Sequence, residues 1–258
     1  MNIGLFPLEQ YQVFLICAVR AAALITAIPV FNTRPVPPQA RIGLIFTITL
    51  LLFPLMKDVL IQQSYTLLEL SFIIINEALL GILLGLVSQL IFTAVSFGGT
   101  IIGYQMGFAA ANIFDPQTTQ QLSLISKFQN ILALLIFLSL NGHHLFFRLI
   151  VESFTILPPG GMDFSGAIGP LIIDLSAKMF LLGLKFSAPV LAILLLSNGV
   201  LGIMARVFPQ LNVFLLSFPI NISISFLVIG LTINITIRIL SREFDNLMVN
   251  IIHIFELL

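Results

Sequence analysis

The sequence contains no tryptophan, a single cysteine and few charged residues. Charged residues make up 9% of the 258 positions and hydrophobic residues 59%, whereas roughly a quarter of the residues in ordinary soluble domains are charged. So few charges cannot cover a water-exposed surface, so lipid, partner proteins or both must cover it. Cys17 has no second cysteine to pair with inside the chain, which leaves the redox compartment undetermined.

Several functional classes lack the residues that they need. The net charge is zero, which gives no indication of nucleic-acid binding. The patterns GxxxxGK[ST], HExxH and GxSxG are absent, so the chain is predicted not to be an enzyme. His143 and His144 are adjacent and do not share a helical face, and no cysteine or acidic residue stands at metal-ligand spacing from them. The sequence therefore predicts no metal and no cofactor.

Long hydrophobic segments dominate what is present. Breakers and polar clusters divide the chain into segments near 11–31, 42–56, 68–97, 122–140, 143–157, 168–207 and 213–240. A helix needs about 20 residues to cross a ~30 Å hydrocarbon core, so 42–56 and 143–157 are short. The segment 168–207 is overlong, and we expect Pro189 or the pair Ser197–Asn198 to bend or break it.

These lengths predict an all-α membrane protein of long bent helices and helical hairpins, in one domain (1–258), partly shielded by other subunits. The amino-terminal segment carries Glu9 and is interrupted by Arg20, so we interpret it as a retained helix and not as a cleaved signal peptide.

Charged residues inside the apolar segments should face protein, water or an opposite charge, because facing lipid is expensive. Arg20 is one such charge. The residues expected to be buried or to lie between subunits are the charged Glu77, Lys127, Lys178, Lys185 and Arg206 and the polar Gln89. Lys178 and Lys185 share a helical face. They form either a polar stripe against a partner helix or one wall of a water-filled path, and the sequence does not decide between the two.

Two ladders of small residues recur at every fourth position. In the first, Gly81 and Gly85 lie between Glu77 and Gln89, which predicts close helix packing. The second contains Gly99, Gly103, Gly107 and Ala111 and leads directly into a polar Asp-Pro turn. Such glycine density weakens a helix, so this segment is either tightly packed or a movable element.

Five ordered motifs carry a family resemblance. They are VPPQARIGL at 36–44, NEALLGILLGL at 76–86, GTIIGYQMGFAAANIFDP at 99–116, NGHHLFF at 141–147 and RVFPQLNVFLLSFPI at 206–220. Together they span almost the whole chain, which resembles the FliR family of flagellar biosynthetic proteins, subunits of the type III protein-export gate. Alternatives are the equivalent subunit of a virulence type III secretion system and, more distantly, a secondary transporter. No convincing internal repeat supports the transporter.

The resemblance implies a partner set and an arrangement. Proteins of this family join FliP and FliQ around a central pore, with FlhB and FlhA as further expected partners and unfolded flagellar proteins as the exported cargo. Residues 1–168 would be FliP-like and 169–258 a FliQ-like hairpin. The location implied is the bacterial inner membrane at the flagellar basal body, with part of the complex on the periplasmic side.

The resemblance also implies a pore plug near 106–121. Its residues would be Met106, Gly107, Phe108, Ala109, Ala110, Ala111, Asn112, Ile113, Phe114 and Asp115. Small residues beside bulky apolar ones can seal a channel by apolar contact and dewetting, and methionine adapts to irregular gaps. The plainer alternative is that 106–114 is buried packing.

Overall fold

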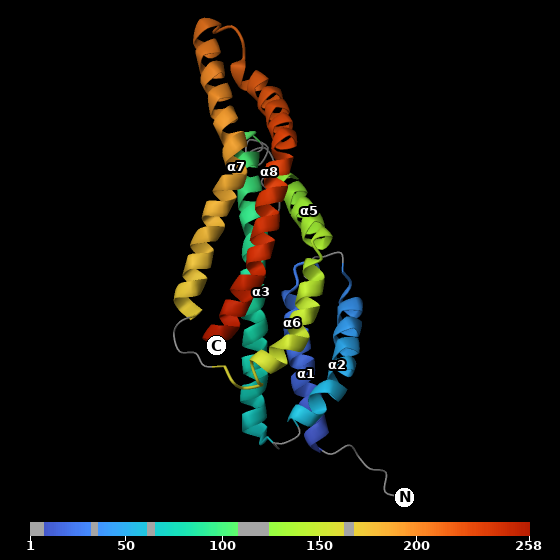
Figure 1. Cartoon of the computed structure of the whole chain (residues 1–258). Coiled ribbons are helices and arrows are strands. Elements are labelled where there is room, and N and C mark those ends of the chain that lie inside the picture. The colour runs from blue at the N-terminus through green and yellow to red at the C-terminus, as the bar shows by residue number, and fades with distance from the viewer. Residues whose placement is uncertain (1–7, 32–35, 61–64, 108–123, 163–167) are drawn as a thin grey trace, which may run out of the picture. The chain divides into compact units, whose positions relative to one another are not determined.

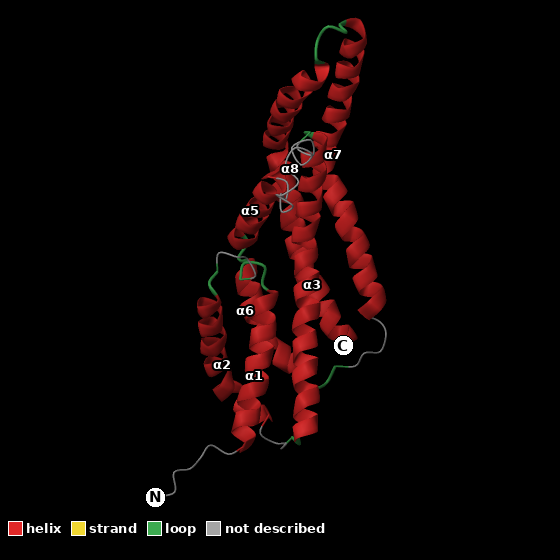
Figure 2. Cartoon of the chain, turned by 180° about the vertical axis from the view of Figure 1, so that it is seen from behind, coloured by secondary structure: helices red, strands yellow, loops and turns green. Residues whose placement is uncertain are grey.

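The computed structural model describes residues 8–31, 36–60, 65–107, 124–162 and 168–258. Within these ranges the chain forms α-helices joined by short turns and contains no strand (Figures 1 and 2). The predicted all-α class is confirmed. The helices are α1 (Leu8–Ala27), α2 (Pro38–Leu60), α3 (Leu67–Gln105), α5 (Leu124–Ser139), α6 (Gly142–Ile156), α7 (Ile168–Val207) and α8 (Val213–Leu257).

Four helices are long and apolar enough to cross a membrane: α1, α3, α7 and α8. Helices α5 and α6 meet at an angle of 60° and together can make a fifth, broken span. The apolar part of α2, Pro38–Pro54, is too short to be counted with them. The sequence-based conclusion that this is a membrane protein and not a bundle of seven equal rods is therefore confirmed.

The expected bend in 168–207 is observed: helix α7 runs unbroken through Pro189 for 40 residues and changes direction along its length (Figure 1). One boundary differs from the prediction. Helix α8 continues to Leu257, well beyond the expected end near 240. The polar residues after 240 end the hydrophobic run but not the helix, because one apolar face persists. Its buried members recur every three or four residues: Leu240, Phe244, Leu247, Ile251 and Ile254.

The turn between α7 and α8 matches the sequence. Pro209 disfavours helix at the preceding residue, and α7 ends at Val207 while α8 begins at Val213. Leu211 N–H donates to Phe208 O at 3.0 Å and closes the turn. This predicted helix break is confirmed.

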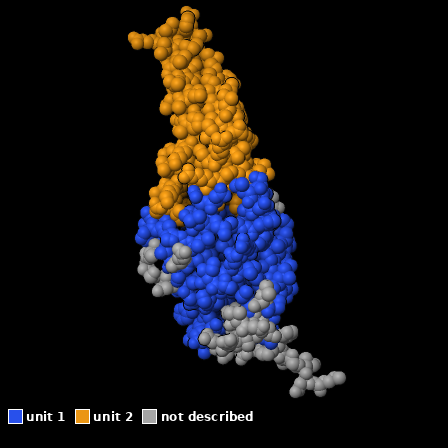
Figure 3. Space-filling model, viewed as in Figure 1, with its two compact units in different colours: residues 1–89, 138–173, 245–258 blue, residues 90–137, 174–244 orange. Residues whose placement is uncertain are grey.

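The chain divides into two compact units (Figure 3). Unit 1 comprises residues 1–89, 138–173 and 245–258, and unit 2 comprises residues 90–137 and 174–244. In unit 1, the buried side of α1 includes Ile16, Cys17, Leu24 and Ile25. In unit 2, the ring centroids of Phe92, Phe137 and Phe244 lie within 6.0 Å of one another, in edge-to-face or tilted arrangements. The likeness of 1–168 to FliP and of 169–258 to FliQ remains a prediction.

Candidate functional site

The predicted plug begins where α3 ends. The structure describes Met106 and Gly107. The other predicted plug residues lie outside the described residues: Phe108, Ala109, Ala110, Ala111, Asn112, Ile113, Phe114 and Asp115. The base of the segment, at the carboxyl end of α3, is therefore the part that the structure defines.

Met106 is fully buried in a cluster of apolar side chains in unit 2. Its N–H donates to Ile102 O at 2.9 Å, so the helical hydrogen-bond pattern reaches this residue. The cluster draws on four helices: Ile102 from α3 with Met106 directly after that helix, Ile125 from α5, Val190 and Leu194 from α7, and Val228 from α8. The base of the predicted plug is therefore anchored in a packed core.

Gly107 is glycine for two physical reasons. Its φ is +92°, a left-handed backbone conformation that side chains disfavour and that does not continue an α-helix. A Cβ atom built here would lie 2.6 Å from Phe218 Cδ1 on α8, far inside van der Waals contact. The aromatic ring thus occupies the space that any side chain at 107 would need.

The second glycine ladder lies against α5 and α7 in unit 2. A Cβ atom at Gly99 would lie 2.6 Å from Ser126 Cα, and one at Gly98 would lie 2.7 Å from Gly183 O. Gly183 also has no room for a side chain, because its own Cβ atom would lie 2.9 Å from Ala94 O. Gly103 is buried. These glycines let three helix backbones approach closely.

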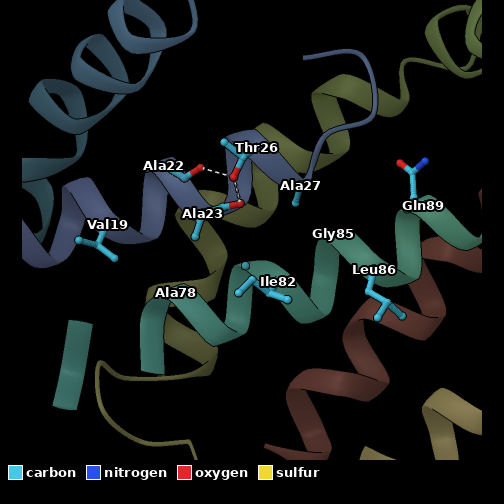
Figure 4. A pocket seen from close by; sticks show the side chains of 11 residues that line it. Val19, Ala22, Ala23, Thr26, Ala27, Ala78, Ile82, Gly85, Leu86 and Gln89 are labelled. Atoms are coloured by element: carbon cyan, nitrogen blue, oxygen red, sulfur yellow. Dashed lines mark hydrogen bonds between the residues drawn. The ribbon is translucent and has the colours of Figure 1, made fainter. Parts of the chain in front are cut away.

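The first ladder brings α3 onto α1 in unit 1. A Cβ atom at Gly81 would lie 2.2 Å from Ala23 Cβ, and one at Gly85 would lie 3.3 Å from Ala27 Cα. Figure 4 shows a shallow groove beside this contact, lined by small side chains and by exposed Gln89. On its α1 side, Thr26 Oγ1 donates back to Ala22 O at 2.8 Å, so the hydroxyl makes its bond within its own helix.

Glu77 is 1% exposed and forms a buried ion pair with Arg20 of α1. Sequence reasoning marked both residues as costly charges but did not pair them. Their pairing could have been proposed from the sequence, because each is an isolated charge in an apolar segment and the two have opposite signs. Their separation of 57 residues hides this contact from any local pattern.

The remaining predicted polar residues lie on the outside of the chain. Gln89, Lys127, Lys178, Lys185 and Arg206 are all exposed. Lys178 Nζ is 2.7 Å from Asp174 Oδ2, one helical turn away. Exposed pairs of this kind contribute little to stability, so these residues are available to other molecules. Within the described part of the chain, no three His, Cys, Asp or Glu side chains are grouped to hold a metal ion.

A polar contact inside the α7–α8 hairpin was missed. Asn221 is 5% exposed; its Oδ1 accepts a hydrogen bond from Ser197 Oγ and its Nδ2 donates to Asn198 Oδ1, both at 3.0 Å. Sequence reasoning had marked Ser197 and Asn198 only as a point of bending. Because buried amides need partners, this contact fixes how the two helices align.

Comparison with known proteins identifies the family. The profile of the bacterial export proteins, family 1, matches residues 11–247. The chain is 36% identical to the flagellar biosynthetic protein FliR of Bacillus subtilis (strain 168), over 92% of each chain. Identity to FliR of Pectobacterium carotovorum subsp. carotovorum is 35%, covering 83% of this chain and 81% of the relative. For FliR of Escherichia coli (strain K12) it is 33%, covering 80% and 78%. Since these matches cover most of its length, the chain belongs to the FliR family of bacterial export proteins and is a membrane subunit of the flagellar export apparatus.

Proposed function

We propose that this subunit forms the pore of the export channel together with FliP and FliQ, and that its 106–121 segment plugs the pore at rest. Unfolded flagellar proteins would displace the plug as they pass. FlhB and FlhA are the further partners, and part of the assembly lies on the periplasmic side of the inner membrane. The subunit acts by structure and gating and carries out no reaction.

The observation that carries this proposal is the length of exposed apolar surface on two helices. On α7, large apolar side chains are exposed from Ile173, at 71%, to Val207, at 60%. On α8 they are exposed from Phe214, at 64%, to Ile237, at 37%, after which Arg238 and Arg242 are exposed. The stretch on α7 is about 50 Å long at the ~1.5 Å rise per residue of an α-helix, and the stretch on α8 is about 35 Å long.

Lipid cannot cover the whole of the stretch on α7. A straight helix of about 50 Å would need a tilt of more than 50° to fit a ~30 Å hydrocarbon core, beyond the ~40° upper limit of observed tilts. The bend of α7 shortens its span without exposing fewer apolar residues. The excess surface therefore needs protein neighbours, and pore-forming partners with helices of their own supply them.

The base of the plug supports the gating role. Met106 is held in the four-helix cluster, and Gly107 has a left-handed backbone conformation and lies beside the ring of Phe218. A segment attached to a fixed core through a glycine can change course at one point without disturbing the helices below. Apolar residues beyond that point can exclude water and ions from a constriction.

The exposed polar residues are proposed to meet partner subunits. Lys127, Lys178, Lys185 and Arg206 are exposed although they lie in apolar segments. A charge in such a position is best accommodated against protein or water. Lys178 and Lys185 can therefore face either a polar partner helix or the water in a pore.

Two glycines on α7 allow a test of partner contact. Nothing lies within 4 Å of a Cβ atom at Gly199 or Gly202, so the isolated chain has room for a larger residue. We expect Gly202→Leu to reduce co-purification of FliP and FliQ with the tagged chain, and Gly202→Ala to retain it. Leucine favours helix more than glycine does, so lost binding would not reflect a weaker helix. Recovery of a stable solitary monomer from cells that express all three proteins would overturn the partnership.

The plug needs a separate measurement. Deletion of residues 107–114 should raise ion leakage through the assembled complex, read as conductance of reconstituted membranes. The matched control is the intact complex prepared in the same way, with co-purification confirming that the deleted subunit still assembles. Unchanged conductance in an assembled complex would refute the plug and leave the partnership standing.

A further inference from the structure

Arg20 is the largest side chain among the fully buried residues, and every nitrogen of its guanidinium has an acceptor. Nε donates to Glu77 Oε2, and Nη2 donates to Glu77 Oε1 at 2.6 Å. Nη1 donates to Ser153 O at 3.1 Å and to Leu157 O at 2.8 Å. The ring of Phe154 lies 4.3 Å from the guanidinium carbon. All these groups belong to unit 1, in which α6 lies beside α1 (Figures 1 and 2).

The two carbonyl oxygens lie at the end of α6. The helix ends at Ile156, and Leu157 is its C-cap in extended conformation. The last carbonyls of a helix lack intrahelical donors and need others. Here the following residues, Pro158 and Pro159, carry no N–H, and Gly161 N–H donates to Pro158 O. Leu157 N–H still donates to Ser153 O at 2.9 Å, whereas no backbone N–H of the described chain is found to donate to Leu157 O.

Arg20 donates to this helix end from another helix. Its Nη1 atom bonds Leu157 O and adds a second donor to Ser153 O. A positive charge is favoured at a helix C-terminus, where the helix dipole is negative. The planar fork is also suited to this double task, since one edge binds the carboxylate while the other end reaches backbone oxygens.

We propose that Arg20 is the positioning residue that seats the C-terminal end of α6 on α1 and α3, with Glu77 as its counter-charge. Arg20 in an apolar segment is tolerated only when α3 has supplied the carboxylate and α6 the carbonyls. The packing of these three helices in unit 1 thus depends on one side chain. This inference does not rest on FliP, FliQ or the plug.

An ordinary ion pair is the competing explanation, and charge reversal separates the two. If only the pairing of charges mattered, the double variant Arg20→Glu with Glu77→Arg would restore the packing. If Arg20 must also close α6, a carboxylate at position 20 repels the helix carbonyls and the reversed pair fails. Arg20→Lys is the milder variant, because an ammonium keeps the charge but loses the bidentate fork.

Cys17 provides the readout without further engineering. It is the only cysteine in the sequence, is fully buried, and stands one helical turn before Arg20. Its labelling by N-ethylmaleimide in native membranes reports how often α1 separates from its neighbours. We expect labelling in Arg20→Lys and in the charge-reversed variant to be at least about tenfold faster than in the wild type.

A suppressor experiment covers the case in which Arg20→Lys does not accumulate. Replacing both Pro158 and Pro159 by alanine lets α6 extend, so that Gly161 N–H can bond Leu157 O, four residues earlier, in place of Arg20. We expect this change to restore slow labelling of Cys17, or the level of protein in the membrane, in the Arg20→Lys background. Wild-type labelling of the charge-reversed variant, or no restoration by the alanines, would overturn the proposal.

Discussion

The glycine contact between α1 and α3 gives a graded prediction for stability. A Cβ atom at Gly81 would lie 2.2 Å from Ala23 Cβ and 2.7 Å from both Ala23 Cα and Ala23 C. Carbon atoms in good contact are about 3.5–4.0 Å apart, so Gly81→Ala must separate the helices by more than an ångström. Two of the three obstructing atoms are backbone and cannot rotate away.

The size of the effect follows from two opposing terms. Overpacking costs about 1–3 kcal/mol, and alanine gains about 1 kcal/mol of helix propensity over glycine. Because backbone atoms obstruct the site, we take the upper part of the first range and expect Gly81→Ala to destabilise the chain by roughly 1–2 kcal/mol. That corresponds to a fall of roughly 2–8 °C in the unfolding midpoint for a chain of this size.

Two glycines serve as matched controls. At Gly85 the nearest atom is 3.3 Å from the added Cβ atom, so Gly85→Ala needs a shift of only a few tenths of an ångström. At Gly230 nothing lies within 4 Å, so Gly230→Ala should keep the full propensity gain. Thermal unfolding of the purified variants in detergent, followed by size-exclusion chromatography, should rank Gly81→Ala lowest and Gly230→Ala highest. A midpoint for Gly81→Ala at or above that of Gly85→Ala would refute the reasoning.

Two further substitutions test unit 2. Gly107→Ala should raise ion leakage through the complex in reconstituted membranes, because φ of +92° and the ring of Phe218 both disfavour a side chain, and Phe218→Leu in the same chain should reverse part of the effect. Asn221→Leu should destabilise the chain by roughly 1–3 kcal/mol, since it leaves Ser197 and Asn198 without their buried partner. A thermal midpoint unchanged from wild type would contradict the second expectation.

The sequence predicted the helices because their signals are local. Apolar runs and breakers such as Pro209 act on their immediate neighbours, so the boundary between α7 and α8 followed from them. The same local reasoning left open whether 168–207 bends or breaks; α7 stays continuous, and Phe186 and Val190 are buried on either side of Pro189. It failed after residue 240, because a run of apolar residues does not reveal an amphipathic helix that buries one face.

Contacts between individual residues could be predicted less well from the sequence. The ladder at Gly81 and Gly85 predicted that some helix comes close, but nothing in the spacing named α1 as that helix. Arg20 and Glu77 were each identified as costly, yet their contact spans 57 residues. Asn221 attracted no attention, since an amide in an apolar helix becomes informative only beside Ser197 and Asn198.

In this chain the glycine, charged and amide residues within apolar helices specify which helices pack together. Leucine and isoleucine are satisfied equally by lipid, by another helix of the chain or by a partner, so most of the sequence cannot specify one arrangement. The lack of a side chain at Gly81 allows one helix backbone to come close, and the carboxylate of Glu77 needs one cation. Each such residue has a specific partner in the chain: Gly98 contacts Gly183, Asn221 bonds Asn198, and Glu77 pairs with Arg20. Lys185 and Arg206 are exposed, and no hydrogen bond or ion pair is found for either within the described part of the chain. By the same logic we expect other subunits to supply the partners of these two charges, which remains a prediction.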